Sequence, residues 1–132
     1  MEKRHFFPKN ERLFLRKDIN RLFSSGQTFV FYPLRIIYLH DNCDKELSHG
    51  VSLMVSVPKK KFRQAVKRNR IKRIIRESFR LNKNETTTLC KQKEKKLHIA
   101  FLYIGNELKP YVTIEKAVQK ALKRIEETSP LI

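Results

Sequence analysis

Four polar residues recur at positions that share one face of a helix: Asn69, Arg73, Arg76 and Arg80. Spaced at i, i+4, i+7 and i+11, they form a straight row when successive residues are set about 100° apart. A guanidinium is planar, remains charged at any working pH, and meets phosphate oxygens with two parallel hydrogen bonds. The asparagine adds a neutral donor and acceptor suited to a sugar hydroxyl or a base edge. The row therefore predicts contact with the phosphates of a folded nucleic acid.

The row lies in Lys59–Arg80, the segment that carries most of the net charge. It holds eleven lysines and arginines against one acid, Glu77, and so contributes +10 of the total formal charge of +17. Like charges four residues apart destabilise a helix, and one acid cannot neutralise so many bases. The alternatives are a solvated face held by pairs such as Arg73 with Glu77, or a generally basic surface. We predict nucleic-acid binding by Lys59, Lys60, Lys61, Arg63, Lys67, Arg68, Asn69, Arg70, Lys72, Arg73, Arg76 and Arg80.

A second candidate surface combines aromatic rings with a base. Phe29 and Phe31 alternate along a predicted strand, near Phe23, and Arg35 lies on the next strand. Proteins hold single-stranded nucleic acid by stacking bases on such rings beside positive charge. The alternative is that these phenylalanines fill the core.

The chain offers no catalytic or metal-binding motif of its own. It contains no HExxH, no DxD and no Gly-rich phosphate loop. His40 and Cys43 have a ligand-like gap, but two ligands alone make a poor metal site. Asp41 and Asp44 fit solvated turn residues. The other histidines lack partners at helical or strand spacing and are expected to be structural or exposed: His5, His49 and His98.

The length, composition and net charge of the chain indicate one ordered domain with a polyanionic partner. The chain has 132 residues, of which 40% are hydrophobic and 33% charged, and a pI near 10.2. No apolar run approaches the roughly 18 residues that span a bilayer, and the N-terminus lacks a signal-peptide core. We therefore expect a cytoplasmic protein. Cys43 and Cys90 are expected to be free thiols, with a disulfide as the alternative.

The first half of the chain predicts a helix followed by strands. Apolar residues recur at helical spacing over Arg16–Ser24, and Gly26 supplies a helix stop. A short strand before Pro33 and a longer one at Leu34–His40 follow, because aromatic and β-branched residues dominate there. The remaining predicted segments are an extended arm over residues 1–11, a hairpin loop at Asp41–Ser48, and an alternating strand at Gly50–Val57.

The second half predicts a helix, a strand and a helix. From Ala65 onward, Ile71, Ile74, Ile75 and Ser78 share one arc, with Phe79 at its edge, so this helix can bury an apolar stripe opposite its bases. The sequence then predicts a mobile loop at Asn82–Lys96, a buried strand at Leu97–Ile104, a turn at Gly105–Pro110 and an amphipathic helix from Thr113 to about Glu126. The order α-β-β-β-α-β-α predicts a single α+β domain with helices packed on one sheet.

The basic helix resembles the signature helix of bacterial ribonuclease P proteins, whose hallmark is an Arg-Asn-Arg core. The resemblance rests on Ala65–Phe79, AVKRNRIKRIIRESF, in which Arg68, Asn69 and Arg70 match that core. The lead-in Gly50–Lys60 is similar to the strand that precedes this helix in the family, with Pro58 as a departure. The resemblance covers roughly residues 13–126, including Asp18-Ile19, Leu22-Phe23 and Gly26 of the first helix.

This resemblance implies a four-stranded mixed sheet similar to the second domain of ribosomal protein S5. It also implies the protein subunit of an RNA-based endonuclease that removes the 5′ leader of precursor tRNA. The RNA subunit would carry the phosphodiester hydrolysis, with Mg²⁺ held mainly by RNA and substrate, so no side chain is expected to be catalytic. Family members bind the leader between the sheet and the first helix, which would place Phe23, Phe29, Phe31 and Arg35 there.

The implied partners are the ribonuclease P RNA and precursor tRNA, with no membrane and no obligate protein partner. One alternative is a structural RNA-binding protein, such as a ribosomal protein. Another is a DNA-binding regulator, which is disfavoured because strands precede the basic helix where a helix-turn-helix would place another helix.

Overall fold

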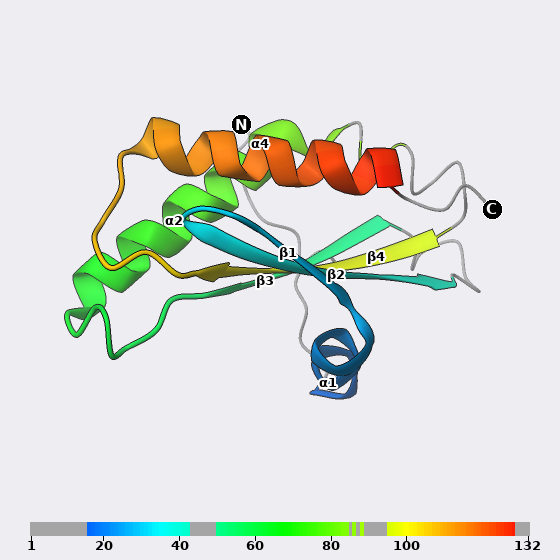
Figure 1. Cartoon of the computed structure of the whole chain (residues 1–132), viewed down its shortest axis with the longest axis horizontal. Helices are drawn as coiled ribbons and strands as arrows, with labels where there is room; N and C mark the ends of the chain where they lie inside the picture. Colours follow the sequence, from blue (N-terminus) through cyan, green and yellow to red (C-terminus); the bar gives the residue numbers. More distant parts are fainter. Residues whose placement is uncertain (1–15, 43–49, 85, 87, 89–94, 129–132) are drawn as a thin grey trace, which may run out of the picture.

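The computed structural model describes residues 16–42, 50–84, 86, 88 and 95–128. The elements follow the predicted order, and Figure 1 shows them as helices on both sides of one sheet. Their bounds are α1 Arg16–Ser25, β1 Gln27–Phe31, β2 Leu34–Asn42, β3 Gly50–Ser56, α2 Ala65–Asn82, β4 Lys95–Tyr103 and α4 Tyr111–Thr128.

The sheet is mixed, and its strand order is β1-β2-β4-β3. β4 pairs antiparallel with β2 and parallel with β3, so α2 forms the crossover between the two parallel strands. The predicted hairpin at Asp41–Ser48 is therefore wrong, since β4 lies between β2 and β3. The physical reason is burial: β4 is the most apolar strand and takes an interior position, with Ile99, Ala100 and Phe101 completely buried. The predicted loop residues 43–48 lie outside the described residues.

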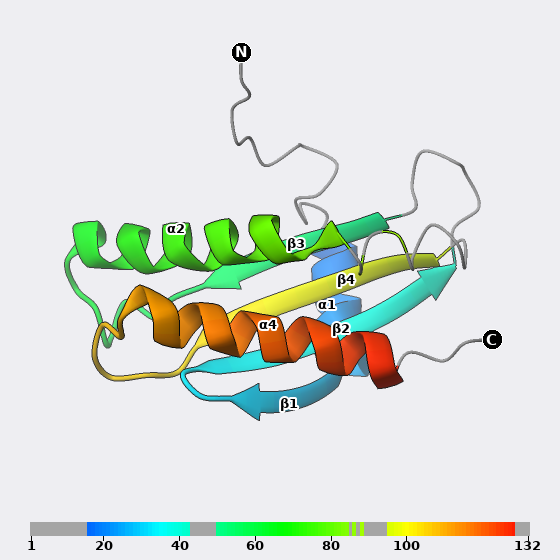
Figure 2. The ribbon, with the colours of Figure 1, turned by 90° about the horizontal axis from the view of Figure 1, so that it is seen from above.

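Two layers of unequal size lie on the two faces of the sheet. α2 and α4 cover one face, and α1 covers part of the other (Figure 1). Figure 2 shows α2 and α4 side by side, both beginning at the end of the sheet where β4 ends. The main core lies between these helices and the sheet, and includes Leu34, Ile36, Leu53, Ile75, Phe79, Phe101, Val118 and Leu122. A smaller cluster under α1 consists of Leu22, Ile37 and Ala100.

The alternation predicted for residues 50–57 is confirmed. Val51, Leu53 and Val57 belong to the main core, whereas Met54 packs against the cluster under α1. Because side chains alternate along a strand, each residue of the sheet can be assigned to one face from this pattern and the strand register.

Several boundaries differ from the prediction by a few residues. β2 and β4 are longer because their ends pair with each other, with Asn42 opposite Lys95. The predicted loop at 82–96 is correspondingly shorter, since Asn82 closes α2 and residues 95 and 96 belong to β4. α4 begins at Tyr111, two residues early, and the amides of Thr113 and Ile114 donate to the carbonyl oxygen of Pro110. The predicted arm at 1–11 and loop residues 85, 87 and 89–94 lie outside the described residues.

Candidate nucleic-acid interface

α2 presents two different surfaces. Its apolar stripe is buried against the sheet, with Ile71, Ile75 and Phe79 inaccessible to solvent and Ile74 at the partly buried edge, as predicted. The opposite surface and the loop before the helix carry the bases. The exposed members of the predicted set are Lys59, Lys60, Lys61, Arg63, Lys67, Asn69, Arg70, Arg73 and Arg76, while Lys72 is half-buried.

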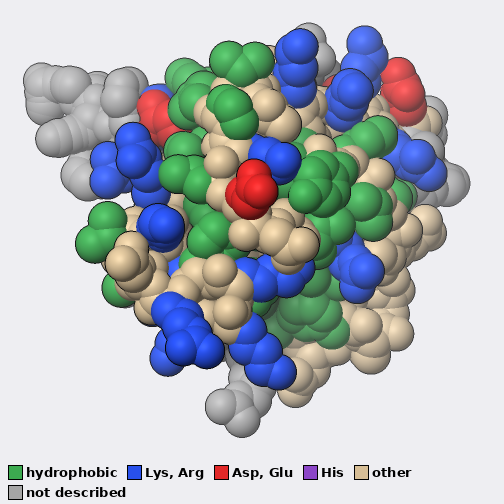
Figure 3. All heavy atoms as spheres, turned by 60° about the vertical axis from the view of Figure 1, so that its left-hand side comes forward, with side chains coloured by type: hydrophobic (Ala, Val, Ile, Leu, Met, Phe, Trp, Pro, Cys, Tyr) green, Lys and Arg blue, Asp and Glu red, His purple; other side chains and the backbone are tan. Residues whose placement is uncertain are grey.

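The exposed bases gather at one end of the molecule. Figure 3 looks onto that end and shows lysines and arginines around patches of exposed hydrophobic side chains, with few acids among them. α2 begins there without an acidic residue in its first turn and without a side-chain cap at Gln64. A helix N-terminus carries partial positive charge, so bases in its first turns repel it and an anion would be stabilising.

Arg68, the first arginine of the Arg-Asn-Arg core, binds the protein's own backbone. Its Nη1 atom donates to the carbonyl oxygens of Phe62 and Arg63, at 2.9 Å each. Lys61 is also engaged, since its Nζ donates to the carbonyl oxygen of Ile104 at 2.8 Å. These two bases hold the loop before α2 against the helix and against the end of β4.

Arg80 does not extend the solvent-facing row. It forms an ion pair with Glu77, with 2.5 Å between Nη2 and Oε2, and its side chain is only 16% exposed. Glu77 thus pairs with Arg80 and not with Arg73. The row that remains accessible consists of Asn69, Arg73 and Arg76, flanked by Arg70.

Replacing Arg68 with alanine should lower the stability of the free protein. The change removes two hydrogen bonds from a charged donor, one of them partly buried, which we expect to cost about 1–2 kcal/mol. Arg70→Ala is the matched control, because Arg70 is exposed and makes no hydrogen bond or ion pair within the described part of the chain; it should change stability by less than about 0.5 kcal/mol. Urea unfolding measures both. Equal midpoints would show that the contacts of Arg68 are not stabilising.

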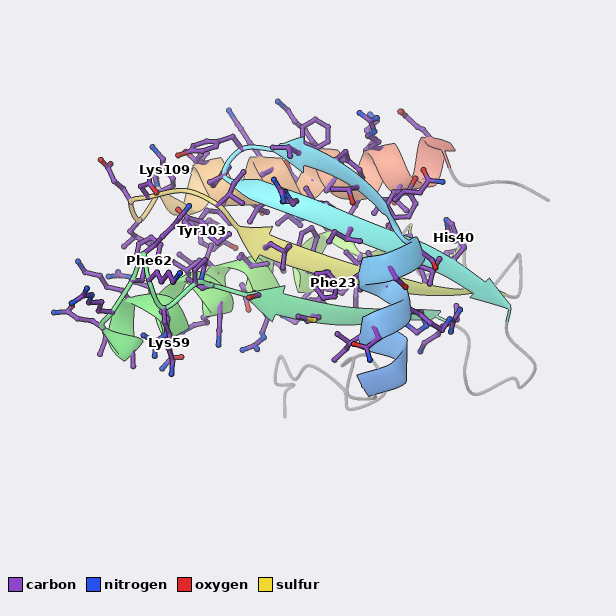
Figure 4. All side chains as sticks on the ribbon, turned by 60° about the horizontal axis from the view of Figure 1, so that its bottom comes forward. Phe23, His40, Lys59, Phe62, Tyr103 and Lys109 are labelled. Atoms are coloured by element: carbon purple, nitrogen blue, oxygen red, sulfur yellow. The ribbon has the colours of Figure 1, made fainter. Side chains whose placement is uncertain are left out.

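Tyr103 fixes the segment that follows β4. Its hydroxyl donates to the carbonyl oxygen of Glu107 at 2.7 Å and accepts from the amide of Lys109 at 3.0 Å. Burial raises the pKa of the Tyr103 hydroxyl above its ordinary value, which keeps it protonated as a donor. Its ring meets that of Phe62 edge-on, with 5.7 Å between centroids. Figure 4 shows Phe62, Tyr103 and Lys109 together at the end of the molecule where α2 begins.

The sheet face that carries α1 holds two of the four residues predicted to contact a single strand. Phe23 projects from α1 with 45% of its surface exposed (Figure 4). Arg35 is exposed and lies on the same face as Ile37, because the two alternate in phase along β2. Opposite Arg35 on β1 is Val30, which is 48% exposed. The basic side chain of Arg35 and the aromatic ring of Phe23 therefore share this face.

Phe29 and Phe31 lie on the other face, so their predicted place beside Phe23 is wrong. Both pack against the main core under α4, and their rings meet edge-on at 5.4 Å between centroids. The guanidinium of Arg124, on α4, lies 4.8 Å from the centroid of Phe29. Successive side chains of a strand point to opposite faces of the sheet. Val30, which lies between the two phenylalanines, is on the face that carries α1, so Phe29 and Phe31 point to the main core. The alternative that these rings fill the core is the one that the geometry supports.

Within the described residues there is no group of three or more His, Cys, Asp or Glu side chains that could hold a metal ion. The ring of His40 packs edge-on against Tyr38 at 5.8 Å, and His98 is buried in β4. None of the described helices is long and apolar enough to cross a membrane. The other residues considered for metal or thiol chemistry lie outside the described residues: His5, Cys43, Asp44, His49 and Cys90.

Comparison with the sequence profiles of known families matches residues 7–126 to the family described as Ribonuclease P. The chain belongs to this family. It is thus a protein component of ribonuclease P, an endonuclease ribonucleoprotein of tRNA processing, and the ribonuclease P RNA is its implied partner. The resemblance carried by the Arg-Asn-Arg core is confirmed.

Individual relatives agree with the family match. The ribonuclease P protein component of Porphyromonas gingivalis W83 is 43% identical over 122 residues, which cover 92% of this chain and 88% of that protein. The component from Chlorobium phaeobacteroides is 38% identical over 99 residues, or 69% and 68% of the two chains.

Solved structures of ribonuclease P proteins share the fold. The protein from Thermotoga maritima superposes with a TM-score of 0.67 at 25% identity, over 87% of this chain and 97% of that one. The protein from Staphylococcus aureus gives a TM-score of 0.63 at 22% identity, over 88% and 95%. The predicted α+β class and four-stranded mixed sheet of this ribonuclease P family member are confirmed.

Proposed function

We propose that this chain binds the ribonuclease P RNA through the exposed bases of α2, and so assists Mg²⁺-dependent removal of the 5′ leader from precursor tRNA in the cytoplasm. The observation that carries the proposal is the row of Asn69, Arg73 and Arg76, flanked by Arg70, on a helix whose opposite stripe is buried against the sheet. A rigid helix holds its guanidiniums at fixed spacing, so phosphates of a folded RNA can be met without ordering a flexible tail.

The proposal assigns catalysis to the RNA subunit. The described side chains do not offer a metal-binding cluster that would fit Mg²⁺, which prefers carboxylate, phosphate and water oxygens. We propose that phosphate oxygens of the RNA and the substrate hold the Mg²⁺ ions. The protein's contribution is then electrostatic: its bases reduce the repulsion between two polyanions and so lower the Mg²⁺ concentration that assembly requires.

We propose that the α1 face takes the 5′ leader of precursor tRNA, with Phe23 stacking on a base and Arg35 meeting the phosphates. Phe29 and Phe31 support the sheet from the other side and take no part in this contact. The single strand would then run over a surface separate from α2, so that one protein holds both the catalytic RNA and its substrate.

Leader removal by the RNA subunit at low Mg²⁺, with and without the chain, tests the proposal. We expect a gain in cleavage rate of roughly tenfold, the factor that about 1.4 kcal/mol of added binding free energy produces. The gain should be larger for a precursor with a long leader than for one with a single leader nucleotide, and Phe23→Ala should remove that difference. No gain, together with stoichiometric co-sedimentation of the chain with ribosomes, would instead indicate a structural RNA-binding protein.

A further inference from the structure

A pocket of about 540 Å³ lies between α2 and the segment that leads into α4, on the opposite side of the sheet from α1. One wall is a stripe of α2 at i, i+3, i+4 and i+7, formed by Arg70, Arg73, Ile74 and Glu77. The facing wall includes Leu108 and Tyr111. Its volume falls within the roughly 300–1,000 Å³ that small-molecule sites occupy.

The two walls differ in chemistry. Leu108 and Tyr111 are large apolar side chains that keep 36% and 38% of their surface exposed. Arg70 and Arg73 are exposed and make no hydrogen bond or ion pair within the part of the chain that the structure describes. A ligand that fills this pocket therefore needs a flat apolar body for Leu108 and Tyr111, and negative charge at the edge for the two guanidiniums.

The charged residues of the lining are mostly basic. Arg70, Arg73 and Lys109 line the pocket together with one acid, Glu77, and both carboxylate oxygens of Glu77 accept from Arg80. The phosphate of a nucleotide is therefore attracted to the guanidiniums of Arg70 and Arg73. Its nucleobase fits the apolar wall formed by Leu108 and Tyr111.

A second hollow of about 400 Å³ continues the surface, and Leu108 lines both. Its walls include Lys61, Arg63 and Lys67. A single strand of RNA with one nucleobase beside Leu108 would thus place its neighbouring phosphates over these basic side chains. The segment between the two hollows is held in place by the Tyr103 hydroxyl and by the contact of Lys61 with Ile104, so the site is formed before any ligand binds.

We propose that this pocket, bounded by Arg70, Arg73, Leu108 and Tyr111, receives one unpaired nucleobase of the ribonuclease P RNA. The inference rests on the proposed function, because it takes RNA as the partner of α2. It adds a base-stacking site that is distinct from the α1 face. RNA offers unpaired bases in loops and bulges, where they can turn out and stack on an aromatic ring.

Fluorescence tests the proposal directly, because the chain contains no tryptophan. Tyr111→Trp places one indole in the pocket, and Val112→Trp is the matched control, since Val112 is 58% exposed and does not line the pocket. On adding full-length ribonuclease P RNA, we expect strong quenching of the indole at position 111 and weak quenching at 112. Adenosine monophosphate at millimolar concentration should also quench position 111, whereas inorganic phosphate should not. Equal quenching at the two positions, or quenching by phosphate alone, would overturn the proposal.

Affinity separates this inference from the proposed function. Tyr111→Ala should weaken binding of the same RNA about tenfold, and Val112→Ala by less than about twofold. If Arg70→Gln with Arg73→Gln weakens binding but Tyr111→Ala does not, α2 contacts RNA and the base pocket is refuted. If the wild-type chain fails to bind the RNA at all, the proposed function itself fails.

Discussion

Changing Arg70 and Arg73 together to glutamine should weaken binding of ribonuclease P RNA about 100-fold. Each guanidinium is exposed and free of partners within the described residues, so each can give a phosphate a charge-assisted contact worth about 1.5 kcal/mol or more. Two such contacts amount to about two factors of ten in the dissociation constant. The logarithmic salt dependence of binding should also become less steep by about 1.4–1.8, since fewer counterions are released.

The measurement is a binding titration of the RNA at several KCl concentrations. The matched control is Lys120→Gln with Lys123→Gln, which removes the same charge from exposed positions on α4. Neither pair should shift the urea midpoint appreciably, because surface substitutions usually change stability by less than about 0.5 kcal/mol. If both pairs weaken binding equally, the RNA responds to net charge and not to the row on α2. Arg68 is left intact in this design because its loss would also release the loop before the helix.

Gly26→Ala should destabilise the fold by about 2 kcal/mol. A methyl group at this position would clash with the carbonyl oxygen of Leu22, and would lie 2.8 Å from Ile37 Cγ2 and 2.9 Å from the carbonyl oxygen of Tyr38. Two of these three atoms belong to the backbone and cannot rotate away. Overpacking of this kind costs about 1–3 kcal/mol, and exceeds the few tenths to 1 kcal/mol that alanine gains by restricting the unfolded chain.

The urea midpoint of Gly26→Ala, compared with that of Ser25→Ala at the exposed neighbouring position, measures this effect. The same variant should bind ribonuclease P RNA normally at low denaturant, because α2 lies on the other side of the sheet. It should discriminate less between long and short leaders, since α1 carries Phe23. An unchanged midpoint would mean that α1 can move away from β2 at little cost.

Gly26 also illustrates what a sequence can and cannot reveal. The glycine was predicted as a helix stop, and α1 does end at Ser25. The structure adds that the amide of Gly26 donates to the carbonyl oxygen of Leu22 at 2.9 Å while the chain passes close to β2. The need for glycine therefore comes from a close approach between two elements. Local sequence does not encode such an approach.

Periodicity predicted the orientation of α2 but not that of β1. Five turns of helix with isoleucines on one arc leave only one way to bury the stripe, so three of the four predicted row residues are accessible: Asn69, Arg73 and Arg76. In a strand, alternation states that Phe29 and Phe31 share a face, but not which face of the sheet it is. That choice depends on the turn that follows α1 and on the packing of α4, both of which are tertiary.

The hydrogen-bond partners of individual basic side chains could not be predicted from the sequence either. Arg68 and Lys61 bind backbone carbonyl oxygens, which every residue possesses, so no residue type marks them in a sequence. The pocket wall at Leu108 and Tyr111 comes from a segment more than thirty residues beyond its partners on α2. The one available signal was a pair of large apolar side chains beside Pro110 in an otherwise polar turn.

The interior position of β4 has a consequence for synthesis of the chain. α2 emerges from the ribosome before β4 and α4 do, yet β2 and β3 join one sheet only through β4, and α4 closes the core over it. The apolar stripe of α2 therefore lacks its full burial surface until the last third of the chain has emerged. Domains complete folding only when their last interior element is available. Newly made chains thus present their most basic segment, before its apolar stripe is covered, to the RNA-rich surface from which they emerge.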